Sequence, residues 1–245
     1  MEELYLKFDD YVSNFDMNNE MIKLKYDHTY RVVEYAKKIA KSESLNEEDY
    51  NIAIKCALLH DIARFKQVKE YNTFYDALSF DHGDEGYNIL LKDDYIDKYT
   101  SNNEEKNIIL KSVKNHNKMR IEEGLTEKEL YFSKLVRDAD KLDIMFTQAK
   151  VITDGSNAIN PILFESLKTK TQVLNKYVIN DCERLFRMLC FIFDFNFNES
   201  FNIVKQEDLV NKKLEIIKNI DIDINKIKDT LNKYIDERID EYVRN

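Results

Sequence analysis

A histidine and an aspartate stand next to each other, at His60 and Asp61, inside the otherwise hydrophobic stretch LLHDIARF. Burying an imidazole beside a carboxylate costs free energy unless something pairs with both, and a divalent cation would satisfy the two groups together. Taken alone, a histidine on an apolar face is more often a hydrogen-bonded core residue. The rest of the chain must therefore decide between a metal ligand and a core histidine.

Further residues of the metal-ligating types lie before and after this doublet. His28 precedes it in the stretch HTYRVVEYAKKIAK, and the phrase RDADKLD holds three carboxylates, those of Asp138, Asp140 and Asp143. A histidine, a His-Asp doublet and a later carboxylate cluster together favour metal binding over the core interpretation.

This order of residues, in these contexts, resembles the HD superfamily of metal-dependent phosphohydrolases. The resemblance covers about residues 20–150. It implies an all-α fold, the HD-domain helical bundle, in which four signature residues converge on one divalent metal ion. Three of the four are His28, His60 and Asp61.

The fourth ligand implied by the resemblance is one of the later aspartates, and we expect Asp140. In the resembled proteins this ligand stands in a phrase of the form ADxL, and residues 139–142 read ADKL. Asp138 points about 200° away around a regular helix, so both cannot face the same ion. Asp138 stays the alternative.

The chain's two other histidines, His82 in HGDEG and His116 in KNHNK, stand between the doublet and the last aspartate. Several branches of the superfamily hold a second metal ion with such a pair. The HG-x-x-G phrase is similar to the branch that hydrolyses dinucleoside polyphosphates symmetrically, although Asn117 stands where that branch has a threonine. Each histidine has an alternative interpretation when taken singly: His82 would be a surface residue of a loop, and His116 would favour the negative end of a helix dipole.

The resemblance thus implies six nitrogen and oxygen donors without a thiolate. Such a set suits one or two divalent ions, iron or manganese first, with magnesium, cobalt, nickel or zinc also compatible. With two ions, a metal-activated hydroxide would attack phosphorus, since coordination lowers the pKa of water from about 16 to about 7. The expected ligands are His28, His60, Asp61, His82, His116 and Asp140.

Arg64 lies one turn beyond His60 if the helix continues through the doublet, so the two side chains would share a face. A guanidinium there would neutralise negative charge that develops on a phosphate, and we expect Asp61 and Arg64 to carry catalysis. The alternative for Arg64 is a solvated salt bridge. Lys118 and Lys141 are similar candidates that could equally be plain surface lysines.

Helices must position all these residues, because the 245-residue chain holds only four glycines and one proline. Hairpins and glycine-rich phosphate loops need more turn residues than that. One predicted helix opens with His28, and a second follows Ser44 and continues unbroken through His60 to Phe65. Residues 66–82 lose the helical period and predict a long loop. Further helices are predicted at 86–91, 100–117 and 125–150, and then at about 170–197, 206–219 and 222–243.

Gly155 and Pro161 mark a loop between two parts of the chain. We expect residues 1–150 to form the metal-binding core and residues 151–245 to form a C-terminal helical extension packed on it. The last helix carries an apolar stripe that packs on its own core or forms a homodimer contact. The stripe consists of Ile224, Ile227, Leu231, Tyr234, Ile235 and Ile239.

Net charge and composition limit which partners and which cellular location the sequence predicts. The net charge of −9 repels polyanions, so we expect a small phosphate substrate and no long nucleic acid. The sequence shows no apolar run of about 18 residues and no secretory leader, which predicts a cytoplasmic protein without membrane contact. Cys56, Cys182 and Cys190 form no C-x-x-C pair and are predicted to be buried free thiols.

These patterns together predict a metal-dependent phosphohydrolase that acts on a small phosphate ester or anhydride, with a nucleotide as the favoured substrate. Two alternatives belong to other classes. Some relatives with the same bundle and paired irons are oxygenases, and a bundle with a weakened site would be a non-catalytic nucleotide-sensing module. Product formation, oxygen consumption and binding without turnover distinguish the three.

Overall fold

The computed structural model describes residues 2–147, 159–217 and 223–244. Within these ranges the chain is helical and contains no β-strand, so the all-α prediction is confirmed. The chain divides into two compact units, Met1–Asp140 and Lys141–Asn245. The boundary expected at residue 150 lies outside the described residues, and packing of the extension on the core stays a prediction.

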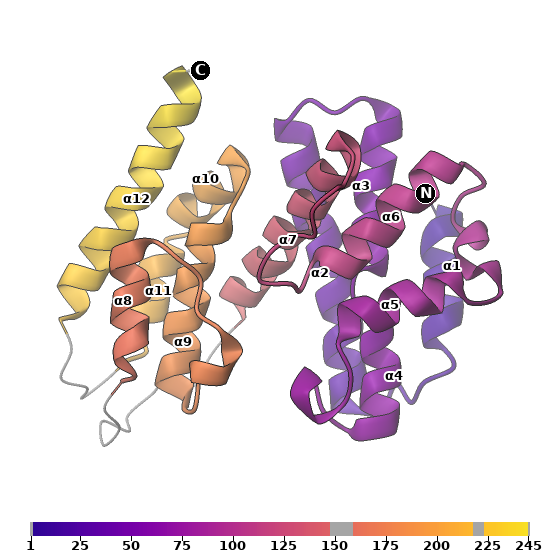
Figure 1. Ribbon diagram of the computed structural model, residues 1–245, viewed down its shortest axis with the longest axis horizontal. Helices are drawn as coiled ribbons and strands as arrows, with labels where there is room; N and C mark the ends of the chain where they lie inside the picture. Colours follow the sequence, from indigo (N-terminus) through magenta and orange to yellow (C-terminus); the bar gives the residue numbers. More distant parts are fainter. Residues whose placement is uncertain (1, 148–158, 218–222, 245) are drawn as a thin grey trace. The chain divides into compact units, whose positions relative to one another are not determined.

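The first unit is built around two neighbouring helices joined by a short turn, α2 (Glu20–Ser42) and α3 (Glu47–Leu59) (Figure 1). Each starts at an asparagine, Asn19 or Asn46, whose side chain accepts hydrogen bonds from backbone amides of the first turn. Because Asn19 caps α2, the helix begins well before His28, and the prediction that His28 opens a helix is wrong.

The doublet itself interrupts the helix that the sequence predicts. α3 ends at Leu59 and is followed by His60 as its C-cap, and α4 (Ile62–Tyr71) begins after Asp61, whose φ of −105° and ψ of 20° lie outside the helical range. Neighbours in an unbroken helix point about 100° apart and could not both face one centre. The break turns both side chains toward the same place, with His60 Nε2 3.4 Å from Asp61 Oδ2.

An aromatic layer supports this break from the N-terminal helix, α1 (Glu2–Val12). Phe8 and Tyr11 each meet the ring of Phe65, with ring centroids 5.9 and 6.2 Å apart. The hydroxyl of Tyr11 donates a hydrogen bond to the carbonyl oxygen of Ile62, at 3.1 Å. The backbone directly after the doublet is therefore held by a helix that the metal-ligand pattern does not include.

After the doublet, α4 runs six residues beyond Phe65 and ends on Asn72, which adopts the left-handed conformation that closes many helices. The predicted long loop is shortened to residues 72–81, which we call the crossing segment. It contains one 3-10 turn, η1 (Asp76–Leu78). In Figure 1 the crossing segment leaves α4 and returns to the start of α5 (His82–Leu91).

The first unit is completed by α6 (Asn103–Asn115) and by α7 (Glu127–Phe146) as far as Asp140. The 3-10 stretch η2 (Lys92–Lys98) leads from α5 toward α6. α6 packs against α3 and α5. This packing brings the end of α6, where His116 lies, to the level of the break between α3 and α4.

Two glycines let α5 approach α6 closely. A Cβ on Gly83 would lie 2.7 Å from the carbonyl oxygen of Lys114 and closer still to the side chain of Asn117. A Cβ on Gly86 would lie 2.8 Å from Cγ1 of Val113. The HG-x-x-G phrase therefore has a packing reason. A side chain at Gly83 would meet the backbone of α6 and push the two helices apart, and one at Gly86 would crowd the side chain of Val113.

The second unit contains the end of α7, four short helices and one long C-terminal helix within the described residues. After α7 come α8 (Pro161–Thr169), α9 (Asp181–Leu189), α10 (Asn198–Gln206), α11 (Leu209–Leu214) and α12 (Ile224–Arg244), with 3-10 turns at Asn175–Tyr177 (η3) and Cys190–Asp194 (η4). The continuous helix predicted over 170–197 is wrong, because residues 170–180 lie largely outside the α-helical conformation and α9 gives way to η4.

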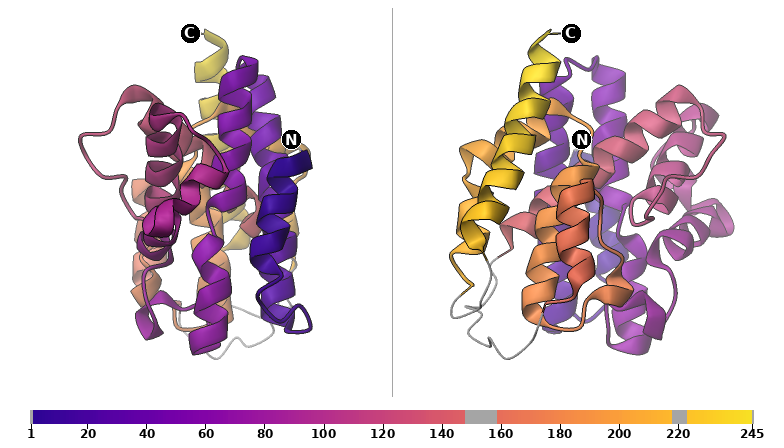
Figure 2. Two further views of the ribbon diagram at one scale, coloured as in Figure 1. Left: turned by 90° about the vertical axis from the view of Figure 1, so that its right-hand side faces the viewer. Right: turned by 60° about the vertical axis from the view of Figure 1, so that its left-hand side comes forward.

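The apolar stripe of α12 packs within the second unit. Ile227, Leu231 and Ile235 are buried, and α12 contacts α8, α10 and α11 (Figure 2). A homodimer formed through the C-terminal helices stays a prediction. All three cysteines are buried free thiols, as expected. None of the described helices combines the length and the apolar composition that crossing a bilayer requires.

Candidate metal centre

The first cluster joins α2, the break and α7. His28 and His60 are buried, and their Nε2 atoms lie 3.3 Å apart. Oδ2 of Asp61 is 3.4 Å from each of them. Oδ1 of Asp140 is 3.2 Å from His28 Nε2 and 3.8 Å from His60 Nε2. The aspartate that reaches this cluster is thus Asp140, the residue preferred on the ADKL phrase.

The second cluster joins α5 and α6. His82 and His116 are buried, with their Nε2 atoms 3.0 Å apart. Oδ1 of Asp61 lies 3.5 Å from both. The two oxygens of Asp61 therefore face different histidine pairs, so this carboxylate stands between the clusters.

Each cluster offers donors close enough to hold an ion. The ligand atoms of His28, His60 and Asp61 all lie within 4.8 Å of one another, and so do those of Asp61, His82 and His116. All six residues expected as ligands are thus brought together from segments far apart in the chain. Their role in binding metal is a proposal that this geometry supports.

The hydrogen bonds of the histidine Nδ1 atoms show whether a cation fits between the Nε2 atoms. Nδ1 of His116 lies 2.7 Å from the carbonyl oxygen of Val113, and Nδ1 of His82 lies 2.6 Å from Oδ2 of Asp76. Both partners only accept, so each Nδ1 carries the hydrogen, and in the neutral ring Nε2 keeps a lone pair. Two lone pairs 3.0 Å apart repel each other. A cation that receives both would remove this repulsion, so the donor set fits a metal ion.

The protonation states of these side chains also favour metal binding. Burial lowers the pKa of His82 to about 4, with the positive charge of Arg64 acting in the same direction. Burial likewise lowers the pKa of His60. Burial would raise the pKa of Asp61, but the positive charge of Lys25 beside it holds that pKa well below its usual value. Neutral imidazoles beside an ionised carboxylate are the forms that bind divalent metals.

Lys25 is a member of this site that the sequence analysis missed. Its Nζ lies 2.6 Å from Oδ2 of Asp61, and its side chain is 13% exposed. It stands three residues before His28 on α2, so helical spacing places both on one face. That spacing was the signal available in the sequence.

Arg64 does not share a helix face with His60, because the helix breaks between them. Its NH1 group donates to the carbonyl of Phe74 at 2.8 Å and to Oδ1 of Asp76 at 2.9 Å. Its Nε is buried without a hydrogen-bond partner, 3.5 Å from Oδ1 of Asp61. One end of the guanidinium thus holds the crossing segment while the other faces the centre, and its role in catalysis stays a prediction.

The two lysines considered alongside Arg64 both form ion pairs. Nζ of Lys118 lies 2.7 Å from Oδ1 of Asp81 and 2.8 Å from Oδ2 of Asp84. Nζ of Lys141 lies 2.5 Å from Oδ2 of Asp194. These contacts supply carboxylate partners that the sequence spacing did not show.

Arg137 is a second residue that the sequence analysis missed. It is buried on α7, and its NH1 donates to the carbonyls of Asn115, His116 and Lys118 at 2.9, 3.3 and 2.5 Å. Carbonyls at the C-terminal end of a helix lack partners within the helix. Arg137 satisfies those at the end of α6 and so fixes the backbone that carries His116.

The sequence matches the family described as HD domain over residues 26–145, a range that includes both clusters. The chain therefore contains an HD domain and belongs to the HD superfamily, as the resemblance predicted. No curated protein and no solved structure matches the chain significantly.

Proposed function

We propose that the protein is a metal-dependent phosphohydrolase that acts on a small phosphate ester or anhydride, with a nucleotide as the favoured substrate. The observation that carries the proposal is the arrangement of two histidine pairs on the two oxygens of Asp61. A carboxylate between two donor clusters suits a two-metal site for phosphoryl transfer.

His28, His60 and Asp140 would hold one ion, His82 and His116 the other, and Asp61 both. This set of imidazole and carboxylate donors without a thiolate favours iron or manganese, with magnesium, cobalt, nickel and zinc also compatible. When bound, divalent ions lower the pKa of a coordinated water and polarise phosphoryl oxygens. The protein's part is to hold the donors in place and to keep their lone pairs free.

Positive charge beside the centre supports an anionic substrate. Lys25 and Arg64 approach opposite oxygens of Asp61, at 2.6 and 3.5 Å. The ring of Phe74 lies next to both, 5.4 Å from Lys25 Nζ and 5.8 Å from Arg64 Cζ. Cations bind phosphate oxygens, and an aromatic ring next to them suits a nucleobase on the same substrate. The net charge of −9 disfavours a long polyanion, which leaves a small nucleotide.

The test uses protein stripped with a chelator and reloaded with each candidate metal. It is offered nucleoside phosphates, dinucleoside polyphosphates and simple phosphate esters, and products are measured by chromatography. Asp61→Asn keeps the shape of the shared side chain and removes its charge, so we expect hydrolysis to fall by at least about 100-fold.

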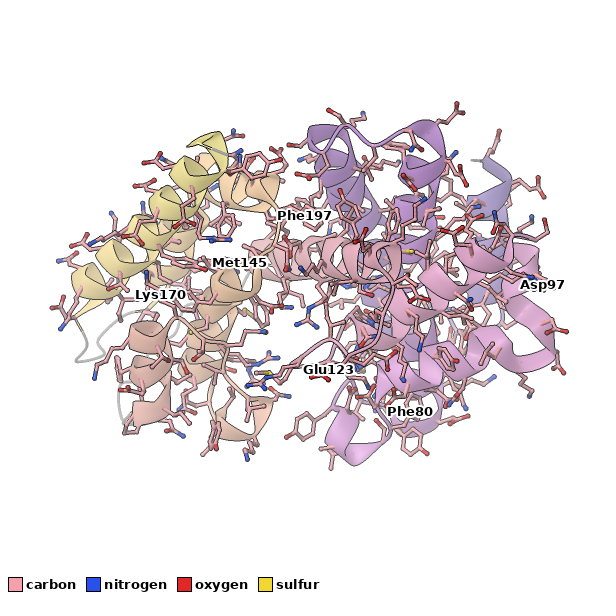
Figure 3. The ribbon with its side chains drawn as sticks, turned by 45° about the horizontal axis from the view of Figure 1, so that its top comes forward. Phe80, Asp97, Glu123, Met145, Lys170 and Phe197 are labelled. Carbon is pink, nitrogen blue, oxygen red and sulfur yellow. The ribbon has the colours of Figure 1, made fainter. Side chains whose placement is uncertain are left out.

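The matched control is Asp97→Asn, the same substitution at a half-exposed position on η2 where the aspartate pairs with Lys106 (Figure 3). It should keep full activity. Loaded protein that hydrolyses no member of the panel would contradict the proposal. Dioxygen consumption would then favour the oxygenase alternative, and tight nucleotide binding without product would favour the sensing module.

A further inference from the structure

The four histidines of the centre are not positioned in the same way. Nδ1 of His60 bonds to the carbonyl of Ala57, and Nδ1 of His116 bonds to that of Val113, both at 2.7 Å. Each of these partners lies three residues earlier in the same helix, so it is present whenever the helix is folded. His82 instead depends on a side chain from outside its own helix.

That side chain is Asp76, in the η1 turn of the crossing segment. Its Oδ2 accepts from Nδ1 of His82 at 2.6 Å. The amide nitrogen of Asn117 is also near, 3.2 Å from the same Nδ1. The carboxylate cannot donate, so the shorter contact requires the hydrogen on Nδ1 and leaves Nε2 of His82 free to bind a cation.

Asp76 is in turn held by two residues of α4. Its Oδ1 accepts from NH1 of Arg64 at 2.9 Å and from Nε2 of Gln67 at 3.0 Å. Gln67 is fully buried, and its Nε2 also reaches the hydroxyl of Ser79 at 2.7 Å. These polar contacts attach the crossing segment to α4.

The crossing segment offers few apolar anchors of its own. No residue of η1 is buried, and Leu78 is 69% exposed. Phe80, labelled in Figure 3, packs edge-on against Tyr71, which is itself exposed. The position of Asp76 therefore depends mainly on Arg64 and Gln67, and a segment held this way opens at lower cost than a packed helix.

We propose that Asp76 is a positioning residue that makes the second cluster conditional on the crossing segment. When the segment is docked through Arg64 and Gln67, Asp76 fixes the tautomer and direction of His82, and the cluster of His82, His116 and Asp61 can take its ion. When the segment is released, the first cluster keeps all its donors and the second loses one. The two ions should bind in sequence, the first cluster before the second. This inference rests on the two-metal site of the proposed function.

The test measures the two binding steps separately. Cobalt(II) is titrated into metal-free protein, with calorimetry giving the two affinities and the visible absorption of bound cobalt reporting the ligand environment. Asp76→Ala should lower the affinity for the second ion by about 10- to 100-fold and leave the affinity for the first ion unchanged. Asp76→Asn, whose amide oxygen can still accept from Nδ1, should show a smaller loss. Gln67→Leu should weaken the same step and add little to Asp76→Ala in the double variant, because both act through one carboxylate.

Asp84→Asn is the matched control, since it makes the same charge change on α5 at an exposed carboxylate that pairs with Lys118. It should bind both ions like the wild type. An equal loss of affinity for both ions in Asp76→Ala would reveal a general structural role and overturn the inference. So would an unchanged second affinity. A wild-type protein that takes up a single ion would overturn the two-metal function itself, which is a different result from either of these.

Discussion

Replacing Gly83 by alanine tests whether close approach of α5 and α6 builds the second cluster. The added Cβ would lie 2.7 Å from the Lys114 carbonyl oxygen, about 0.7 Å short of the 3.4 Å at which ordinary contact begins. A backbone carbonyl cannot rotate away as a side chain can, so the two helices must separate. Overpacking of this kind costs about 1–3 kcal/mol, and the better helix propensity of alanine returns at most about 1 kcal/mol. We expect the free energy of unfolding to fall by about 1–2 kcal/mol.

The same displacement separates His82 from His116. A shift of about 0.7 Å exceeds the tolerance of about 0.5 Å within which functional groups must be held. Because misplacement by about 1 Å can cost about 100-fold in rate, hydrolysis should fall by about 10- to 100-fold. This loss is larger than the change in stability would cause in a protein that remains folded.

Urea denaturation and steady-state hydrolysis measure the two effects, and two other glycines provide controls. In Gly86→Ala the new Cβ would come too close to a side-chain atom, Cγ1 of Val113, while Ile62 and Ala63 would lie at ordinary contact distances. A side chain can shift more easily than a backbone carbonyl, so a smaller loss is expected. In Gly124→Ala the Cβ meets open space, and the φ of 80° strains the backbone. That variant should lose stability and keep activity. A Gly83→Ala enzyme as active as the wild type would refute the reasoning, as would equal loss of activity in all three variants.

Other properties follow from the same structure. Arg137→Met removes the hydrogen bonds to the carbonyls of Asn115, His116 and Lys118, at and just beyond the end of α6, so the free energy of unfolding in urea should fall by about 3 kcal/mol; a change below about 1 kcal/mol would show that water replaces the guanidinium. Burial raises the pKa of the Cys56 and Cys190 thiols to about 12, so a thiol reagent at pH 8 should label them only after denaturation. Rapid labelling of the folded protein would contradict that expectation. Treatment with a chelator should abolish hydrolysis and lower the Tm, because a bound ion stabilises only the folded state, and manganese or iron(II) should restore both; a stripped protein that stays active would exclude the metal mechanism.

The residue types of the centre could be found from the sequence because they carry their own chemical signal. A His-Asp doublet in an apolar stretch is costly without a partner. Helical direction showed only that Asp138 and Asp140 cannot both face one ion, and the preference for Asp140 came from the resemblance of ADKL to the family's phrase. The helical class also followed from local information, since few glycines and one proline leave little else possible. Each of these signals is local, and the metal-binding interpretation came from their order in several segments of the chain.

Other features were decided only by tertiary packing. The break at His60 and Asp61 sends Arg64 toward Asp76, whereas helical periodicity assumes an uninterrupted helix. Nothing in the spacing of the crossing segment indicated that Asp76 meets His82. Such contacts form between residues of different elements, so they depend on how those elements pack and not on the sequence of either segment alone.

The sequence by itself thus determined which atoms are available to bind a metal ion, because donor chemistry belongs to each residue. The tertiary structure decided how they are aimed. Arg137 reaches the end of α6, and Gly83 lets α5 close on that same end, each across a distance along the chain that no local pattern encodes. The lone pair of a histidine Nε2 is aimed by the hydrogen-bond partner of Nδ1 and by the position of the helix that carries the ring. The position of each helix is set only when separate helices pack together.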